Sequence, residues 1–196
     1  IFDKNNKLVD VVEKPEKPQN NFAVTGIYLY GPKIFFEAFQ NIERSARGEY
    51  EISSIHSYFL KHGKNVGYKE ITGWWKDTGK PNDLLLANKL LLERIRDQKQ
   101  IGIGSVVANT DIIEPVIIGE NCEIKNCTIG PNVTIGKNSK IQNTKIDNSI
   151  ILDSVEIDCD MIITGSLIGN QVKISKQKNK KNKLQMIIGD KTVIEF

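Results

Sequence analysis

Two short segments in the first half of the sequence carry side chains that can bind hydroxyl and phosphate groups. Glu13 and Lys14 follow an aliphatic run and precede a proline. The carboxylate can orient sugar hydroxyls there, and the ammonium can neutralise a phosphate. Arg47 lies in a loop before an expected helix, where its guanidinium can bind phosphate. Taken alone, a solvated strand end and an ordinary helix-cap region are the alternatives for these two segments.

A third segment, residues 73–81, could hold a metal ion. Trp74 and Trp75 precede Asp77 at an expected strand-to-helix loop, and α/β proteins bind ligands at the carboxyl ends of their strands. The Asp77 carboxylate suits Mg²⁺, because this hard cation prefers oxygen donors and keeps coordination positions for substrate phosphates. The alternative is that Asp77 or Thr78 caps the helix that follows.

These segments need strands and helices to position them. Strands are expected at residues 8–12, 25–30 and 66–72, and helices at residues 33–42, 51–62 and 81–96. Alternating strands and helices indicate an α/β sheet covered by helices. His56 and His62 are expected to be partly exposed, and Gly63 should end the second helix. The apolar residues with helical spacing, which we expect to be buried, are Ile34, Phe35, Ala38, Ile42, Ile52, Ile55, Phe59, Leu84, Leu85, Leu91, Leu92 and Ile95.

The second half of the sequence contains a repeat. Its large aliphatic residues are separated by twelve steps of five or six residues, and Asp160 alone breaks the rule that Ser, Thr, Cys or Val stands two places before them. This period fits neither a helix nor an alternating strand, but it fits short extended segments that meet at corners. The expected inward column is Val106, Ile112, Ile118, Ile124, Ile129, Ile135, Ile141, Ile146, Ile151, Ile157, Ile162, Ile168 and Ile174.

Asparagine and glycine are expected at the corners of this repeat, because both tolerate left-handed backbone angles. Stacked triangular coils would then bury a continuous isoleucine column. Residues 175–186 break the repeat and are expected to form a loop insertion, whose five lysines are most simply solvated. An anion or nucleotide clamp at Lys176–Lys183 is the alternative. The corner asparagines are Asn126, Asn132, Asn138, Asn143 and Asn148.

The composition indicates two architectures. Thirteen of the 14 aromatic residues lie in residues 1–76, whereas isoleucine rises from 8 in residues 1–100 to 21 in the rest. We therefore expect two domains, residues 1–98 and 99–196. The net charge of +3 argues against nucleic-acid binding, and no apolar run is long enough to cross a membrane. Three cysteines without zinc-site spacing favour a reducing, cytoplasmic location.

Four motifs and the repeat together resemble a known family. The motifs lie at residues 12–15, 23–28, 47–52 and 73–81, in that order. This combination resembles the sugar-1-phosphate nucleotidyltransferases, most closely the long-form glucose-1-phosphate thymidylyltransferases with a C-terminal left-handed β-helix. The resemblance implies the end of a Rossmann-like α/β nucleotidyltransferase domain followed by an all-β, left-handed parallel β-helix of hexapeptide repeats.

The resemblance also implies an activity and the residues that serve it. In this family a sugar 1-phosphate attacks dTTP or UTP and expels pyrophosphate, with Mg²⁺ as cofactor. Asp77 would be one of two aspartates that hold Mg²⁺. The substrate-binding residues would be Glu13 for sugar hydroxyls, Lys14 and Arg47 for phosphate, Val24, Thr25 and Gly26 for the sugar pocket, and Trp75 beside the substrate.

The sequence departs from the family pattern in two ways. Ser53 and Ser54 stand where the family usually has Thr-Asp. The glycine-rich, arginine-containing loop that cradles the triphosphate and the second Mg²⁺ aspartate are absent and would precede Ile1. The chain opens on Ile1 and has its first methionine at Met161. We therefore expect a fragment with no catalytic residue of its own and no nucleotidyltransferase activity alone.

Two other functions fit parts of the sequence. Hexapeptide β-helices often belong to acyltransferases, here one that would acetylate an amino-sugar phosphate, but residues 101–196 contain no histidine to act as the base. The third interpretation is a non-catalytic module for trimerisation or regulation. Since solenoid faces favour side-by-side packing, we expect a homo-oligomer, most simply a trimer formed through the β-helix.

Overall fold

The computed structural model describes residues 1–96, 100–175, 183–184, 187–190 and 193–195. By compactness the chain divides into two units, Ile1–Gly73 and Trp74–Phe196. The expected loop insertion at residues 175–186, with its lysines, lies largely outside the described residues.

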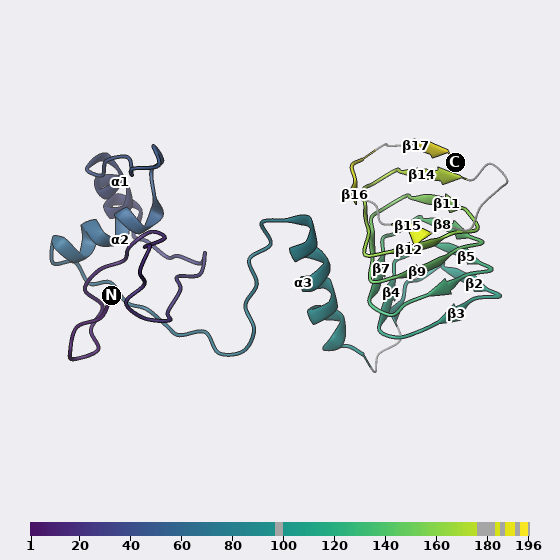
Figure 1. Ribbon diagram of the computed structural model, residues 1–196, viewed down its shortest axis with the longest axis horizontal. Coiled ribbons are helices and arrows are strands. Elements are labelled where there is room, and N and C mark those ends of the chain that lie inside the picture. The colour runs from purple at the N-terminus through teal and green to yellow at the C-terminus, as the bar shows by residue number, and fades with distance from the viewer. Residues whose placement is uncertain (97–99, 176–182, 185–186, 191–192, 196) are drawn as a thin grey trace. The chain divides into compact units, whose positions relative to one another are not determined.

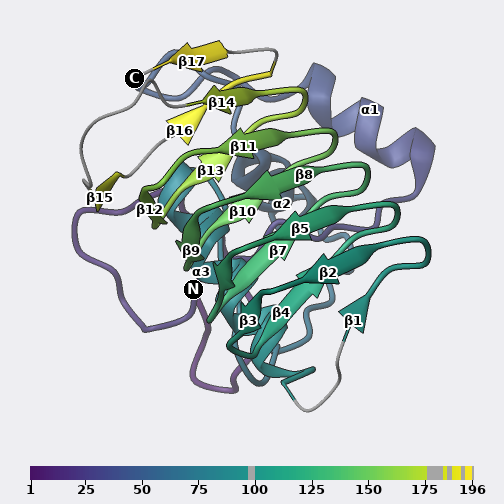
Figure 2. The ribbon, with the colours of Figure 1, turned by 90° about the vertical axis from the view of Figure 1, so that its right-hand side faces the viewer.

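The second unit contains a parallel β-solenoid with three sheets (Figures 1 and 2). In every sheet a strand pairs in parallel with the strand three places further along the chain. This topology confirms the predicted β-helix and is consistent with its left-handed form. The first sheet holds β1 (Gln100–Ile101), β4 (Val116–Ile118), β7 (Val133–Ile135), β10 (Ile150–Ile151), β13 (Leu167–Ile168) and β16 (Ile187–Ile188). The second holds β2 (Val106–Ala108), β5 (Glu123–Lys125), β8 (Lys140–Gln142), β11 (Glu156–Asp158), β14 (Lys173–Ser175) and β17 (Val193–Glu195). The third holds β3 (Asp111–Ile112), β6 (Thr128–Ile129), β9 (Lys145–Asp147), β12 (Ile162–Thr164) and β15 (Lys183–Leu184).

The solenoid core is the predicted isoleucine column, with two errors of register. Val106 is 55% exposed and Ile162 is 41% exposed, whereas Ile163 is fully buried and Val107 packs against the core. A one-residue slip in a strand moves a side chain to the opposite face, which is why each error exchanges an inward for an outward position. In the corrected register the residue two places before the inward Ile163 is the buried Met161 and not Asp160, so this corner still departs from the rule of Ser, Thr, Cys or Val.

The predicted corners are confirmed. All five predicted asparagines have positive φ, from 44° at Asn148 to 61° at Asn132, as do Asn109 and Asn121. Gly130 has a φ of 108°, and a Cβ there would lie 1.9 Å from the carbonyl oxygen of Ile113. The corners therefore select residues that accept left-handed angles, and Gly130 is also required by the close approach of the neighbouring coil.

The first unit is built around two of the predicted helices, α1 (Pro32–Gln40) and α2 (Ile52–Lys61). They pack through a small buried cluster of Ala38, Ile55 and Phe59. The amide of Lys64 donates to the carbonyl of Phe59 at 2.9 Å, and Gly63 has a φ of 66°. This is the predicted glycine stop after the second helix.

The three strands predicted in this half are wrong as elements. Residues 8–12, 25–30 and 66–72 are not strands, and the described part of the first unit contains one isolated antiparallel bridge, between Phe2 and Leu8. An extended segment becomes a strand only when a neighbouring segment supplies hydrogen-bonding partners along its length. No described segment of this unit does so, and Ile27 and Leu29 stay 80% and 98% exposed.

The helix α3 (Pro81–Glu93) begins at Pro81 as predicted and lies in the second unit. Its Asn88 donates to the carbonyl of Asn132 at 3.3 Å and accepts from the hydroxyl of Thr134 at 2.6 Å, which fixes the helix on β7. Leu92 is buried, as predicted. Leu84 and Leu91 are exposed, contrary to prediction, because α3 carries leucines on several of its sides and one side packs against β7. The expected domain boundary near residue 98 remains a prediction.

Candidate functional site

The first unit brings together two of the predicted site residues that lie far apart in the sequence. A side-chain oxygen of Glu13 lies 3.8 Å from Nη1 of Arg47. Arg47 also contacts Glu49 at 3.1 Å through Nη2 and Glu51 at 3.4 Å through Nη1. The guanidinium, which is the expected phosphate ligand, is therefore surrounded by three carboxylates.

The loop before α2 positions Arg47. The amide of Ser45 donates to the carbonyl of Glu49 at 2.8 Å, and the amide of Gly48 donates to the carbonyl of Ser45 at 2.8 Å. Gly48 has a φ of 79°, a left-handed angle that suits glycine. This closed turn presents Arg47 at the N-terminal end of α2.

The segment that carries Glu13 is tied to α2 as well. The hydroxyl of Ser57 lies 2.6 Å from the Asp10 carboxylate and donates to the carbonyl of Val11 at 2.8 Å. These bonds fix the segment just before Glu13 against the middle of the helix. Consequently α2 holds both charged groups of the Glu13–Arg47 pair.

The structure does not bring the other site residues predicted in this unit together with the Glu13–Arg47 pair. Lys14 is exposed and has a positive φ of 38°. Val24 is 58% exposed, Gly26 is exposed and Thr25 is half-buried. Among the described interactions of this unit, none joins Lys14 or Thr25 to Arg47, so their roles in substrate binding remain predictions.

An aromatic cluster next to Glu13 was not identified from the sequence. The hydroxyl of Tyr30 and Nε2 of His56 share a hydrogen bond of 2.7 Å, and the Tyr28 ring lies 5.1 Å from the His56 ring. Burial raises the pKa of Tyr30 to about 12. Burial, followed by the Glu13 charge, raises the pKa of Tyr28. The alternation of Tyr28 and Tyr30 on one side of an extended segment was the available signal.

His56 itself corrects a prediction. It was expected to be partly exposed, but it is 8% exposed, because its position on α2 faces the two tyrosines. Its Nδ1 is buried without a hydrogen-bond partner among the described residues. Burial lowers the pKa of its imidazole. His62 is exposed at the end of the helix, as predicted.

The remaining two predicted site residues lie in the second unit. Trp75 is 49% exposed, and its neighbour Trp74 receives the Arg94 guanidinium 5.1 Å from its ring centroid. Asp77 is exposed in the loop before α3. The alternative that Asp77 or Thr78 caps this helix is wrong, because Lys80 occupies the N-cap position and its amide donates to Asp83 at 3.1 Å.

The Asp77 carboxylate fits Mg²⁺ as a single ligand. It is exposed, its two oxygens would lie 3.8 and 3.9 Å from a Cβ at Gly79, and no ion pair to it occurs in the described part of the chain. The adjacent Lys76 is paired with Asp83 at 2.6 Å rather than with Asp77. No group of three or more potential metal ligands occurs within the described residues. Mg²⁺ is commonly bound by one or two protein carboxylates together with substrate phosphates, and Asp77 can supply one such carboxylate.

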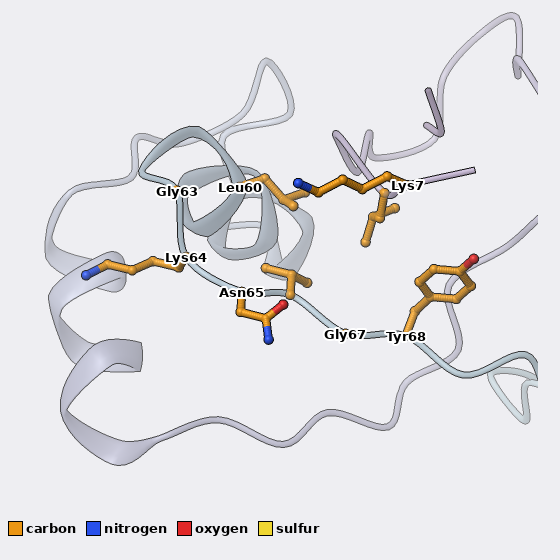
Figure 3. Close-up of a pocket in the computed structure, with 9 residues that line it drawn as sticks. Lys7, Leu60, Gly63, Lys64, Asn65, Gly67 and Tyr68 are labelled. Carbon is orange, nitrogen blue, oxygen red and sulfur yellow. The ribbon is translucent and has the colours of Figure 1, made fainter. Parts of the chain in front are cut away.

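A cavity of about 500 Å³ lies elsewhere in the first unit (Figure 3). It is lined by Lys7, Leu60, Tyr68 and their neighbours, and by none of the predicted site residues. Lys64 extends away from the other labelled side chains in Figure 3. A second space of about 610 Å³ lies on the solenoid, and its lining includes Asn109, Asn126 and Asn143. Neither space contains the charged pair.

The comparisons with known proteins match both halves of the chain. Residues 1–94 match the family model described as "Nucleotidyl transferase", and residues 112–195 match "GMPPB C-terminal domain".

Within the described residues, no helix combines the length and apolar character that crossing a membrane requires.

Curated relatives extend this similarity over the whole chain. A glucose-1-phosphate thymidylyltransferase of Streptomyces antibioticus is 32% identical over all of this chain and 58% of its own length. A low-salt glycan biosynthesis nucleotidyltransferase of Haloferax volcanii is 32% identical, with 88% of this chain and 52% of its own length covered. A bifunctional sugar-1-phosphate nucleotidylyltransferase/acetyltransferase of Sulfurisphaera tokodaii is 33% identical, with 86% and 43% covered. The chain thus spans about half the length of these relatives. It joins nucleotidyltransferase-domain sequence to a parallel β-solenoid, and the relatives named here are nucleotidyltransferases.

Proposed function

We propose that the protein containing this chain transfers a nucleotidyl group from a nucleoside triphosphate to a sugar 1-phosphate, with glucose 1-phosphate and dTTP as substrates. The observation that carries the proposal is the contact between Glu13 and Arg47, because it joins two separate motifs in one charged cluster. The identity to the thymidylyltransferase over the full chain supports the choice of substrates.

In this proposal the residues of the first unit bind the sugar phosphate. Glu13 accepts hydrogen bonds from sugar hydroxyls, while Lys14 and Arg47 bind the phosphate through charge-assisted hydrogen bonds. Thr25 and Gly26, with Val24, border the sugar. A phosphate oxygen of the sugar 1-phosphate forms a bond to the α-phosphorus of the triphosphate, and the bond from this phosphorus to the pyrophosphate oxygen breaks. Such a reaction depends mainly on positioning and on charge neutralisation.

Asp77 would hold Mg²⁺ in this proposal, with Trp75 beside the substrate. The ion would neutralise charge on the triphosphate and on the leaving pyrophosphate. The sequence contains no Gly-x-Gly-x-Arg segment. We therefore assign no residue of this chain to the triphosphate, and the test uses the polypeptide as the organism makes it.

The proposal is tested by incubating that polypeptide with glucose 1-phosphate, dTTP and Mg²⁺, and measuring pyrophosphate and dTDP-glucose. We expect both products in equal amounts, and loss of both when Mg²⁺ is chelated. Asp77→Asn should lower kcat, whereas Asp111→Asn, an exposed aspartate on the solenoid, should not. No pyrophosphate with any pairing of sugar 1-phosphate and nucleoside triphosphate would contradict the proposal.

An acetyltransferase activity on an amino-sugar phosphate is the second candidate. The bifunctional relative of Sulfurisphaera tokodaii favours it by name. The two histidines of the chain, His56 and His62, both lie in the first unit, so the solenoid supplies no histidine base. Acetyl-CoA with glucosamine 1-phosphate separates the candidates, since free CoA would be released only by an acetyltransferase.

A non-catalytic role of the solenoid in assembly is compatible with either activity. We propose a homotrimer formed through the solenoid faces, because flat parallel faces favour side-by-side packing. Light scattering should return three times the chain mass. A monomer at micromolar concentration would contradict this part of the proposal.

A further inference from the structure

Arg47 is held unequally by its three carboxylates. The side chain of Glu51 is 10% exposed, whereas those of Glu13 and Glu49 are 32% and 62% exposed. Exposed ion pairs constrain a long side chain weakly, because water competes for both partners. The buried carboxylate is therefore the contact best able to fix the guanidinium.

Hydrogen bonds tie Glu51 to the turn that carries Arg47. One oxygen of Glu51 accepts from the hydroxyl of Ser45 at 2.9 Å and from Nη1 of Arg47 at 3.4 Å. The same hydroxyl accepts from the backbone amide of Arg47 at 3.2 Å. The backbone and the side chain of Arg47 are thus both connected to a single buried carboxylate at the start of α2.

We propose that Glu51 is a positioning residue, which orients Arg47 toward the phosphate of the sugar 1-phosphate, and that Glu49 competes with that phosphate. This inference rests on the proposed function. An incoming phosphate meets Nη2 of Arg47, whose present partner is the exposed Glu49. Binding exchanges that carboxylate for phosphate, while Glu51 keeps its hold on Nη1.

The two carboxylates then have opposite effects, although each is one negative charge beside the same guanidinium. Removing the Glu49 charge frees Nη2 and lowers repulsion, so Glu49→Gln should lower the KM for glucose 1-phosphate about twofold. Removing the Glu51 charge also lowers repulsion, but it weakens the hold on Arg47, because an amide oxygen accepts from the guanidinium without the attraction between opposite charges. Glu51→Gln should therefore raise this KM about tenfold.

The experiment measures KM for glucose 1-phosphate and for dTTP in the polypeptide as the organism makes it. We expect Glu51→Gln to change the first KM and leave the second within about twofold. Ser45→Ala removes the hydroxyl link without changing charge, and it should raise the same KM by a smaller factor. In an Arg47→Ala background, Glu51→Gln should have no further effect, because it acts through the arginine.

The outcomes separate this inference from the function on which it rests. If the unaltered polypeptide forms no sugar nucleotide, the proposed function fails. If the unaltered polypeptide does form the sugar nucleotide and Glu51→Gln lowers the KM for glucose 1-phosphate as Glu49→Gln does, the Glu51 carboxylate acts only through its charge. The positioning role is then wrong. An equal effect of Glu51→Gln with and without Arg47 would also overturn the role. Ser45→Ala keeps the test valid if Glu51→Gln does not fold, since Ser45 is only partly buried.

Discussion

Single residues of α2 and its N-cap residue Glu51 connect the charged cluster to the helical core of the first unit. Glu51 reaches Arg47, Ser57 holds the segment before Glu13, and His56 packs against Tyr28 and Tyr30. The cluster therefore depends on how one helix is seated, and its charged groups are sensitive to changes in that helix. The titration of His56 is the most direct probe of this dependence.

Protonation of His56 should loosen α2. Burial lowers its pKa below the ordinary value of 6.5, so the unfolded chain takes up a proton that the folded unit resists. The contribution of neutral His56 to the free energy of unfolding is fully present above about pH 6.5. It is lost as the pH falls below that value toward the pKa of His56 in the folded unit. We expect hydrogen-exchange protection of the α2 amides, corrected for intrinsic rates, to fall between pH 7 and pH 5.

The neighbouring histidine supplies the control for this prediction. His62→Gln should retain the pH dependence, because that ring is exposed. His56→Gln should remove it, even if it lowers protection at every pH. Protection of α2 that stays constant from pH 7 to pH 5 in the unaltered protein would contradict the prediction.

Among the structural elements, the solenoid strands were predictable because each position is decided locally. A large aliphatic, a small residue and a corner asparagine or glycine recur within six residues, so the repeat can be followed without knowledge of distant contacts. The register failed where two aliphatics stand side by side, at Val106-Val107 and at Ile162-Ile163. Both members of such a pair satisfy the spacing, and only packing against the next coil decides between them.

The structure of the first unit was less predictable, because its elements depend on contacts between residues that are distant in the sequence. Residues 25–30 have strand-like composition, but a strand requires a partner segment, which local sequence does not specify. The approach of Glu13 to Arg47 could be expected only from the family resemblance. The burial of His56 was not predicted because the side chains that cover it are those of Tyr28 and Tyr30, which precede the helix by many residues.

The corner glycine at Gly130 should be intolerant of any side chain. Its φ of 108° and the 1.9 Å approach of a Cβ to the Ile113 carbonyl require the backbone to shift. We expect Gly130→Ala to lower the free energy of unfolding of the solenoid by about 3 kcal/mol. Gly189→Ala, where a Cβ would meet nothing within 4 Å, is the matched control. Urea titration followed by circular dichroism measures both, and equal stabilities would refute the steric explanation.

The attachment of α3 to β7 should depend on Asn88. Both atoms of its amide are used, by the carbonyl of Asn132 and the hydroxyl of Thr134. Asn88→Ala removes two hydrogen bonds, each with a net contribution of about 1 kcal/mol, and should raise hydrogen exchange in α3 by about tenfold or more. Lys89→Ala, at an exposed position of the same helix, should leave the exchange unchanged. Unaltered exchange in Asn88→Ala would show that the leucines alone hold the helix.

For the whole molecule, the two compact units differ in the origin of their stability. The solenoid buries a continuous column in which each coil contacts its neighbours, so its stability is nearly a sum over coils and their interfaces. The first unit buries the small cluster of Ala38, Ile55 and Phe59, with many apolar side chains left exposed. We therefore expect the first unit to unfold at a lower temperature than the solenoid.

A pair of core substitutions tests this expectation. Ile146→Ala, in the fully packed column at β9, should lower solenoid stability by about 2–5 kcal/mol and shift the upper calorimetric transition alone. Ile55→Ala, in the helical cluster, should shift the lower transition alone. If either substitution moves both transitions together, the units unfold as one cooperative body. In that case the stability of the charged cluster around Arg47 would depend on the solenoid core, and Ile146→Ala would also lower the temperature at which turnover of glucose 1-phosphate is lost.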